Sequence, residues 1–190
     1  SRGCDAIIAQ GLEAGGHRGM FLTDDVLSQT GTMALVPQIV DAVDLPVIAA
    51  GGIADGRGMV AALALGASAV QLGTAFLHAE ETTISEAYKA GLRQAGDRQT
   101  AVTNVYSGRP TRCLTNRMML EKGPLTGAAP AFPKGFAVTG PLRQQAEAQG
   151  SSDFSAHYCG QSAALGKPTT AGQLVRDIAH DARQQMNRFT

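Results

Sequence analysis

Short apolar runs alternate with amphipathic segments over the first 80 residues of the chain. The runs are apolar at consecutive positions, which is typical of parallel strands covered on both faces, and they occupy residues 6–9, 47–50 and 69–72. Between them, residues 32–44 and 56–65 carry apolar side chains at helical spacing. Pro37 is expected in the first turn of the first helix, Asp55 at the N-cap of the second and Gly66 just past its end. This alternation predicts an α/β fold with a parallel sheet.

The pattern changes after residue 80. Thr83 is expected to cap a helix that ends near Ala95, and residues 103–112 are expected to form an extended loop. Further helices are predicted at residues 116–122, 142–149 and 171–189. We therefore divide the chain into βα units over residues 1–80 and a helical, irregular extension over residues 81–190.

The three predicted strands are too few for a closed (β/α)8 barrel, which needs eight strands and typically about 250 residues. The chain has no initiating Met and starts almost inside its first strand. We therefore expect it to be the C-terminal part of a TIM barrel, with an open sheet as the alternative.

Composition excludes several classes of partner. Sixteen Lys and Arg residues balance sixteen Asp and Glu residues, so no concentrated basic face for nucleic acid or an anionic membrane is expected. No apolar run approaches the roughly 20 residues of a membrane span. The three cysteines are far apart, which favours neither a disulfide framework nor a metal site and fits the reduced cytoplasm. Asp24 and Asp25 lack a third ligand at a recognisable spacing, so we expect them to cap a loop and expect no metal.

Two glycine-bearing turns follow the second and third strands. Gly51 and Gly52 end one strand, and Gln71, Gly73 and Thr74 end the next. Backbone N–H groups in such turns, beside the N-terminus of the following helix, form a phosphate cradle. Two of them side by side are typical of the phosphate site after the last two strands of a (β/α)8 barrel. They indicate a phosphorylated cofactor, and tight turns without any ligand are the alternative.

A histidine lies between glycines just past the first strand, at His17. Loops at this end of a barrel strand carry catalysis, and an imidazole suits a general base. An exposed loop histidine is the alternative. Glu13 is expected to accept backbone N–H bonds, and Arg18 either binds an anionic substrate or lies on the surface. Arg109 and Arg112 either close over the site or pin their segment through carbonyl contacts.

Several segments together resemble the nitronate monooxygenase family, formerly the 2-nitropropane dioxygenases. They read GCDAIIAQGLEAGGHRGMFLTDD, PVIAAGGIADGRG, ALGASAVQLGTAFL, TNVYSGRPTRCLTNR and GQSAALG. The resemblance implies an FMN-dependent TIM barrel, of which this chain holds strands six to eight and a C-terminal extension. It implies that His17 is the catalytic histidine, which hydrogen-bonds the nitronate and takes the α-proton of a neutral nitroalkane. It places Gln161 near the substrate and implies that FMN is bound by Gln10, Gly15, Gly16, Gly51, Gly52, Gln71, Gly73 and Thr74.

The implied reaction oxidises an alkyl nitronate, such as propionate 3-nitronate, with O2 to a carbonyl compound and nitrite. The flavin supplies the redox chemistry, and the protein supplies position and a base. The FMN-dependent enoyl-ACP reductases share the Gly-Gly-His loop and both turns, but SGRPTRCLTNR and GQSAALG favour the nitronate enzymes. A non-catalytic phosphate-binding module is the third alternative, and homo-oligomerisation is left open.

Overall fold

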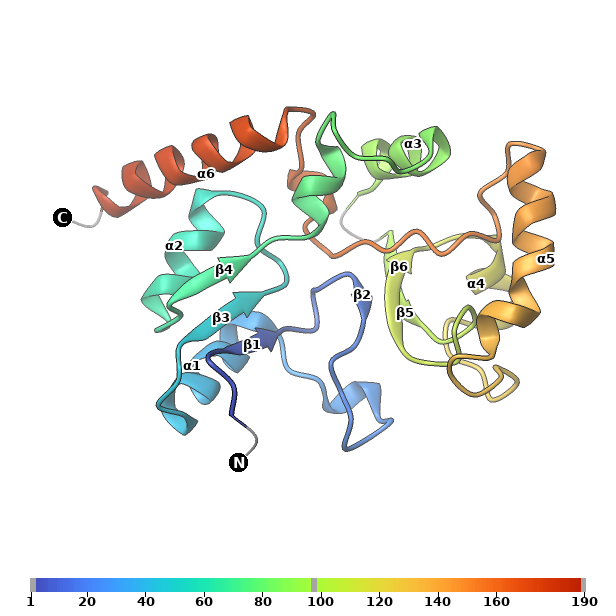
Figure 1. The fold of residues 1–190 in the computed structure, drawn as a ribbon, viewed down its shortest axis with the longest axis horizontal. Coiled ribbons are helices and arrows are strands. Elements are labelled where there is room, and N and C mark those ends of the chain that lie inside the picture. The colour runs from blue at the N-terminus through green and yellow to red at the C-terminus, as the bar shows by residue number, and fades with distance from the viewer. Residues whose placement is uncertain (1–2, 97–98, 189–190) are drawn as a thin grey trace.

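The computed structural model describes residues 3–96 and 99–188, which form two small sheets with helices packed around them (Figure 1). The first sheet contains β1 (Ile7–Gln10), β3 (Val47–Ala50) and β4 (Ala69–Gln71) in the order β1-β3-β4. All its neighbours are parallel, with Ile7 opposite Val47 and Ala50 opposite Gln71. The predicted parallel α/β arrangement is therefore confirmed.

Helices α1 (Thr32–Ala42) and α2 (Gly56–Ala64) cover one face of this sheet. Alternate strand residues point to that face and form a buried apolar core with both helices, made of Ala9, Val36, Val47, Ala49, Ile53, Ala62 and Ala67. The residues between them point the other way. Ile8 there is 54% exposed, and Ala69 and Gln71 are exposed as well. The parallel sheet is thus packed on one side and open on the other.

Both predicted caps of α2 are confirmed, but the predicted place of Pro37 in α1 is wrong. The Asp55 carboxylate accepts hydrogen bonds from the N–H groups of Arg57 and Gly58, at 3.0 and 3.2 Å. Gly66 follows α2 with φ +96°, a left-handed conformation that suits glycine. Pro37 lies inside α1, beyond its first turn. The helix accommodates it because only the carbonyl of Met33, in the first turn of α1, loses its helical partner.

The second sheet was not predicted. It contains β2 (Gly16–His17), β6 (Thr111–Leu114) and β5 (Thr100–Thr103), antiparallel and in that order. The expected extended loop over 103–112 is therefore mostly the turn of a hairpin. All four residues of β6 are buried, and the polar Arg112 among them donates to Leu12 O at 3.0 Å and to Thr100 Oγ1 at 3.2 Å. Since β2 follows β1 closely, this short strand links the two sheets.

The remaining elements are mainly helical. They are η1 (Val26–Ser28), η2 (Thr74–His78), α3 (Glu86–Gln94), α4 (Arg117–Lys122), α5 (Gly135–Ala148), η3 (Ala163–Leu165) and α6 (Ala171–Met186). The helix at 116–122 is confirmed, and Asp25 caps η1 as expected by accepting from Leu27 N. The cap of α3 is Ser85 and not Thr83, because the Ser85 hydroxyl accepts from Tyr88 N.

The last two helices differ from the prediction in their bounds. Helix α5 starts at Gly135 and not at residue 142, with Pro141 inside it. Helix α6 ends at Met186, and Phe189, the predicted end, lies outside the described residues. Helix α6 packs along α2, where the Asp181 carboxylate accepts a hydrogen bond from Gly56 N at 2.9 Å.

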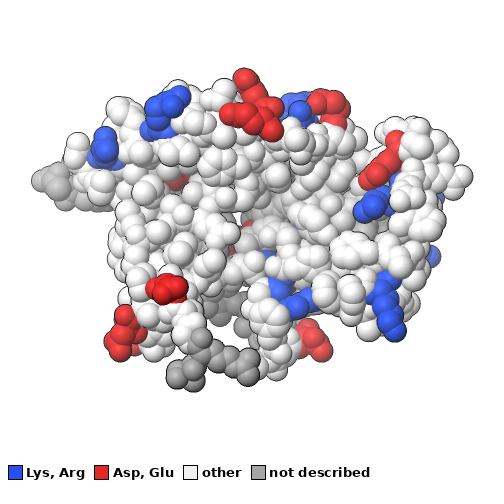
Figure 2. All heavy atoms as spheres, in the orientation of Figure 1, with Lys and Arg blue, Asp and Glu red and all other residues white. Residues whose placement is uncertain are grey.

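Charges of both signs are interspersed over the face of the molecule shown in Figure 2. In residues 3–96 and 99–188, no helix combines the length and the apolar character that crossing a membrane requires.

Candidate active site

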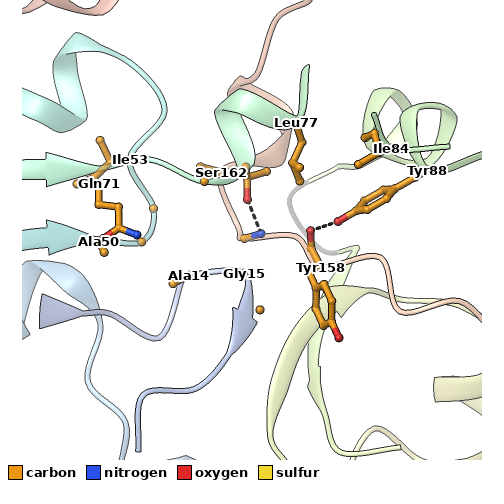
Figure 3. A pocket seen from close by; sticks show the side chains of 16 residues that line it. Ala14, Gly15, Ala50, Ile53, Gln71, Leu77, Ile84, Tyr88, Tyr158 and Ser162 are labelled. Carbon is orange, nitrogen blue, oxygen red and sulfur yellow. Dashed lines mark hydrogen bonds between the residues drawn. The ribbon is translucent and has the colours of Figure 1, made fainter. Parts of the chain in front are cut away.

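A cavity of about 440 Å³ opens at the carboxyl ends of β3 and β4 (Figure 3). Seven of the predicted cofactor residues line it: Gly15, Gly16, Gly51, Gly52, Gln71, Gly73 and Thr74. Its other walls come from distant parts of the chain and include Leu77, Ile84, Tyr88, Tyr158, Gly160 and Ser162. The fold therefore joins both glycine turns and the glycines before His17 around one space, which is large enough for a small ligand.

The glycines of the two turns are required for different reasons. Gly51 and Gly52 have φ angles of +108° and +73°, which side chains rarely adopt. A Cβ on Gly51 would also lie only 2.9 Å from Ala14 N. Gly73 has an ordinary φ of −112°, and a Cβ built there meets no atom within 4 Å. Neither conformation nor packing explains this glycine, so it leaves open space beside the backbone at the cavity wall.

The turns also present hydrogen-bond donors. In the part of the chain that the structure describes, the N–H groups of Gly52, Gly73 and Thr74 donate to no protein acceptor. The N-terminus of α2 is different, because carboxylates of Asp55 and Asp181 already accept its first N–H groups. The first N–H groups of α2 are therefore already paired. The two turns, by contrast, offer unpaired N–H groups for an anion.

His17 does not itself line this cavity, but it follows Gly16 in the chain and its ring contacts Tyr158, and both of these residues line the cavity. Its Nε2 atom is 2.8 Å from Ser107 Oγ. Phe132, Phe136 and Tyr158 surround the imidazole, with ring centroids 5.7, 6.2 and 5.7 Å away. Burial lowers the pKa of His17, and the positive charge of Arg109 lowers it further. The neutral imidazole is thereby favoured, which is the form that accepts a proton.

Arg18 braces the loop that carries His17. Its side chain is only 1% exposed, and its guanidinium donates to Gly11 O at 2.6 Å, Ala14 O at 2.7 Å and Gln29 Oε1 at 2.6 Å. Burial and the charge of Arg112 lower the pKa of Arg18 to about 10. Both alternatives for Arg18, a substrate contact and a surface residue, are wrong.

Arg109, Arg112 and Glu13 also form hydrogen bonds to backbone groups. Arg109 donates to Met20 O at 2.6 Å and stacks 4.4 Å from the ring centre of Phe21. Arg112 reaches Leu12 O, so both arginines pin their segment through carbonyl contacts. Glu13 accepts from Thr32 N at 2.9 Å, as expected of a carboxylate that binds backbone N–H groups.

The match to known proteins covers most of the chain. A family model described as nitronate monooxygenase matches residues 1–181. The chain belongs to the nitronate monooxygenase family.

Curated members of the family are similar at the level of single residues. The nitronate monooxygenase of Pseudomonas aeruginosa is 44% identical over 182 residues, which are 95% of this chain and 52% of that protein. A probable nitronate monooxygenase of Staphylococcus saprophyticus is 41% identical over 190 residues, covering 99% of this chain and 54% of that protein. The chain spans about half the length of the curated relatives it matches.

Two solved structures are similar to the whole chain. Nitroalkane oxidase from Streptomyces ansochromogenes has a TM-score of 0.91 and 39% identity, over 99% of this chain and 54% of that one. FabK from Thermotoga maritima has a TM-score of 0.76 and 34% identity, over 98% of this chain and 57% of that one. Of these two folds, the nitroalkane oxidase is the more similar.

Besides His17, two residues predicted as ligand contacts do not line the cavity in this member of the nitronate monooxygenase family. The Gln10 amide donates to His17 O at 3.1 Å and accepts from Gly19 N at 2.7 Å, so it spans the base of the loop. Gln161 is exposed, and its backbone N–H donates to Glu13 O at 2.9 Å. The neighbours of Gln161, Gly160 and Ser162, line the wall in its place.

The aromatic wall was missed. The Tyr88 hydroxyl donates to Tyr158 O (Figure 3). The Tyr88 ring also stacks on His157, with ring centroids 4.2 Å apart. Burial raises the pKa of Tyr88, which keeps its hydroxyl a donor. These residues lie 70 positions apart in the chain, and Tyr158 follows an irregular segment, so no local pattern indicates their contact.

We predict that Arg18→Met lowers the free energy of unfolding by about 3 kcal/mol, because it leaves buried carbonyl groups of the His17 loop without donors. Thermal or denaturant unfolding measures this loss. The control is Arg117→Met, which removes an exposed ion pair to Glu121 and should change stability by less than about 1 kcal/mol. Equal effects of the two substitutions would contradict the bracing role.

Proposed function

We propose that this chain forms the FMN-phosphate side and the catalytic base of a nitronate monooxygenase. The enzyme oxidises alkyl nitronates, such as propionate 3-nitronate, with O2 to a carbonyl compound and nitrite. One observation carries the proposal: His17, half-buried and with a lowered pKa, lies beside Tyr158 of a cavity whose glycine turns have unpaired N–H groups. Family membership and the similarity to a nitroalkane oxidase support it.

The cavity fits FMN in size and in the distribution of its donors. Gly52, Gly73 and Thr74 would hold the phosphate through their N–H groups, and the open space at Gly73 allows it close to the backbone. The Gln71 amide lies on the same wall, and the opposite end is apolar, with Leu77 and Ile84. When bound, the flavin supplies the redox chemistry, since no protein side chain carries electrons from a nitronate to O2.

His17 supplies the proton chemistry. The neutral imidazole can take the α-proton of a nitroalkane, and the resulting imidazolium can donate a hydrogen bond to the nitronate anion. Arg109 lowers the pKa of His17 through its positive charge, and the same charge favours an anion beside the ring. Because the pKa lies below its usual 6.5, the base remains available at neutral pH and is lost only as the pH falls through that lowered value.

The exposed face of the parallel sheet favours the proposal that this sheet is part of a larger barrel. Parallel sheets in α/β proteins are normally covered on both faces. Here α1 and α2 cover one face, and Ile8 on the other is 54% exposed. We assign the βα units of residues 1–80 to strands six to eight of a TIM barrel whose other strands cover that face, and residues 81–190 to an extension packed on it. Unpaired Cys4, Cys113 and Cys159 fit a cytoplasmic enzyme.

The full-length protein, purified with FMN, should be yellow. Given propionate 3-nitronate, it should consume O2 and release nitrite, followed by an oxygen electrode and a colorimetric nitrite assay. A colourless protein that ignores added FMN would contradict the proposal. Oxidation of NADH with a crotonyl thioester, without turnover of nitronates, would instead identify an enoyl reductase, and flavin binding without any turnover would identify a binding module.

We predict that Gly73→Val weakens FMN binding at least ~10-fold, because the new side chain enters the space beside the phosphate donors. Titration of apoprotein by flavin fluorescence quenching measures the affinity. Folding should be unchanged, since a Cβ at Gly73 meets no atom of the described residues within 4 Å. Gly127→Val is the matched control, at an exposed position with equally open space. Unchanged affinity in Gly73→Val would remove this turn from the cradle.

A further inference from the structure

The Ser107 hydroxyl is the one hydrogen-bond partner of the His17 ring among the described residues, and its own surroundings are fixed. Ser107 is fully buried in the turn between β5 and β6. A Cβ on Gly135 would lie 2.6 Å from Ser107 C, and a Cβ on Gly108 would collide with Pro130 O. Backbone therefore packs tightly around this serine, and its hydroxyl cannot move far.

Three groups surround the hydroxyl. His17 Nε2 lies at 2.8 Å, Arg109 O at 3.1 Å and Arg109 N at 3.2 Å. A serine hydroxyl has one proton to donate and two lone pairs to accept with. The backbone N–H of Arg109 can only donate, so it occupies one lone pair. The carbonyl of Arg109 can only accept, and among the described residues the Ser107 hydroxyl is its one donor, so the hydroxyl proton satisfies this carbonyl.

The remaining lone pair of the hydroxyl faces His17 Nε2, so this nitrogen must carry a hydrogen and donate it. We propose that Ser107 is a positioning residue that holds His17 as the tautomer protonated on Nε2, so that Nδ1 is the nitrogen that takes up a proton. The alternative tautomer would turn the Ser107 proton toward the ring and leave Arg109 O without that donor.

This arrangement suits a base that must gain and lose a proton repeatedly. In the imidazolium, Nε2 still carries its hydrogen, so Ser107 keeps the same three partners when Nδ1 is protonated. Protonation on Nε2 would instead require the hydroxyl to turn. The positive charge of Arg109 and burial, which lower the pKa of His17, favour return to the neutral form. The assignment of Nδ1 as the base rests on the proposed function, whereas the tautomer does not.

The tautomer is measured directly by long-range ¹H–¹⁵N correlation spectra of full-length protein labelled in its histidines. The chain has four histidines, and the His17 signals are those lost in His17→Gln. Above the pKa of His17, we expect a protonated Nε2 and an unprotonated Nδ1. A neutral His17 protonated on Nδ1 would overturn the inference, whether or not the protein turns over nitronates. The expected tautomer in a protein without such turnover would overturn only the proposed function.

The second test is Ser107→Ala, which removes the acceptor that stabilises the imidazolium. The pKa of His17 should fall further, and the acid limb of the pH profile with a neutral nitroalkane should move to lower pH. Turnover of that substrate should drop about tenfold, and turnover of the preformed nitronate should drop less. Ser155→Ala is the control, because Ser155 is also buried and its hydroxyl donates to Glu147 Oε1 at 2.7 Å. An unchanged pKa and acid limb in folded Ser107→Ala would overturn the inference; if this variant does not fold, the wild-type tautomer decides alone.

Discussion

The hydrogen bonds that buried Arg18 donates to the backbone around it hold together the loop on which the rest of the site depends. Residues 11–19 follow β1 of the parallel sheet and contact the Gly51 turn through Ala14. They include β2, which places His17 in the second sheet. A loop with this path exposes carbonyls that no strand or helix can pair, and a planar guanidinium with several donors satisfies them together. Gln10 adds a brace at the base of the loop. The position of His17, the proposed catalytic base, is thus set by side-chain contacts to backbone as well as by the short strand β2.

These braces also shape the electrostatics of the site. Arg18 and Arg112 are buried near Glu13. Burial lowers the pKa of both guanidinium groups, and the negative charge of Glu13 opposes this shift in each. Burial lowers the pKa of His17, and the charge of Arg109 lowers it further. The lowered pKa favours a neutral His17 imidazole, in surroundings where three arginines face one carboxylate, Glu13. Such surroundings stabilise an anion that forms beside the ring, which is what abstraction of a proton from a nitroalkane produces.

The sequence predicted the parts of the site that depend on local structure. The strands β1, β3 and β4, the Asp55 cap and the glycine turns follow from residues that are neighbours in the chain, and the structure places seven of the expected residues around one cavity. The hairpin β5–β6 was not predicted, because burial of Arg112 depends on Leu12 O, 100 residues away. Tyr88 and Tyr158 were missed for the same reason. Gln10 had the residue type of a ligand contact, but its amide is used by the loop, and only the three-dimensional structure distinguishes these uses.

The central claim is that His17 acts as the base for neutral nitroalkanes. His17→Asn retains a polar side chain of similar reach but cannot take up a proton. The most direct measurement is therefore the turnover of this variant on a nitroalkane and on the matching nitronate, in full-length enzyme with its FMN content checked. We expect the variant to retain its flavin. Its turnover of the nitroalkane should fall at least ~100-fold, and its turnover of the nitronate should fall much less. Unchanged turnover of the nitroalkane would contradict the central claim, as would an equal loss on both substrates.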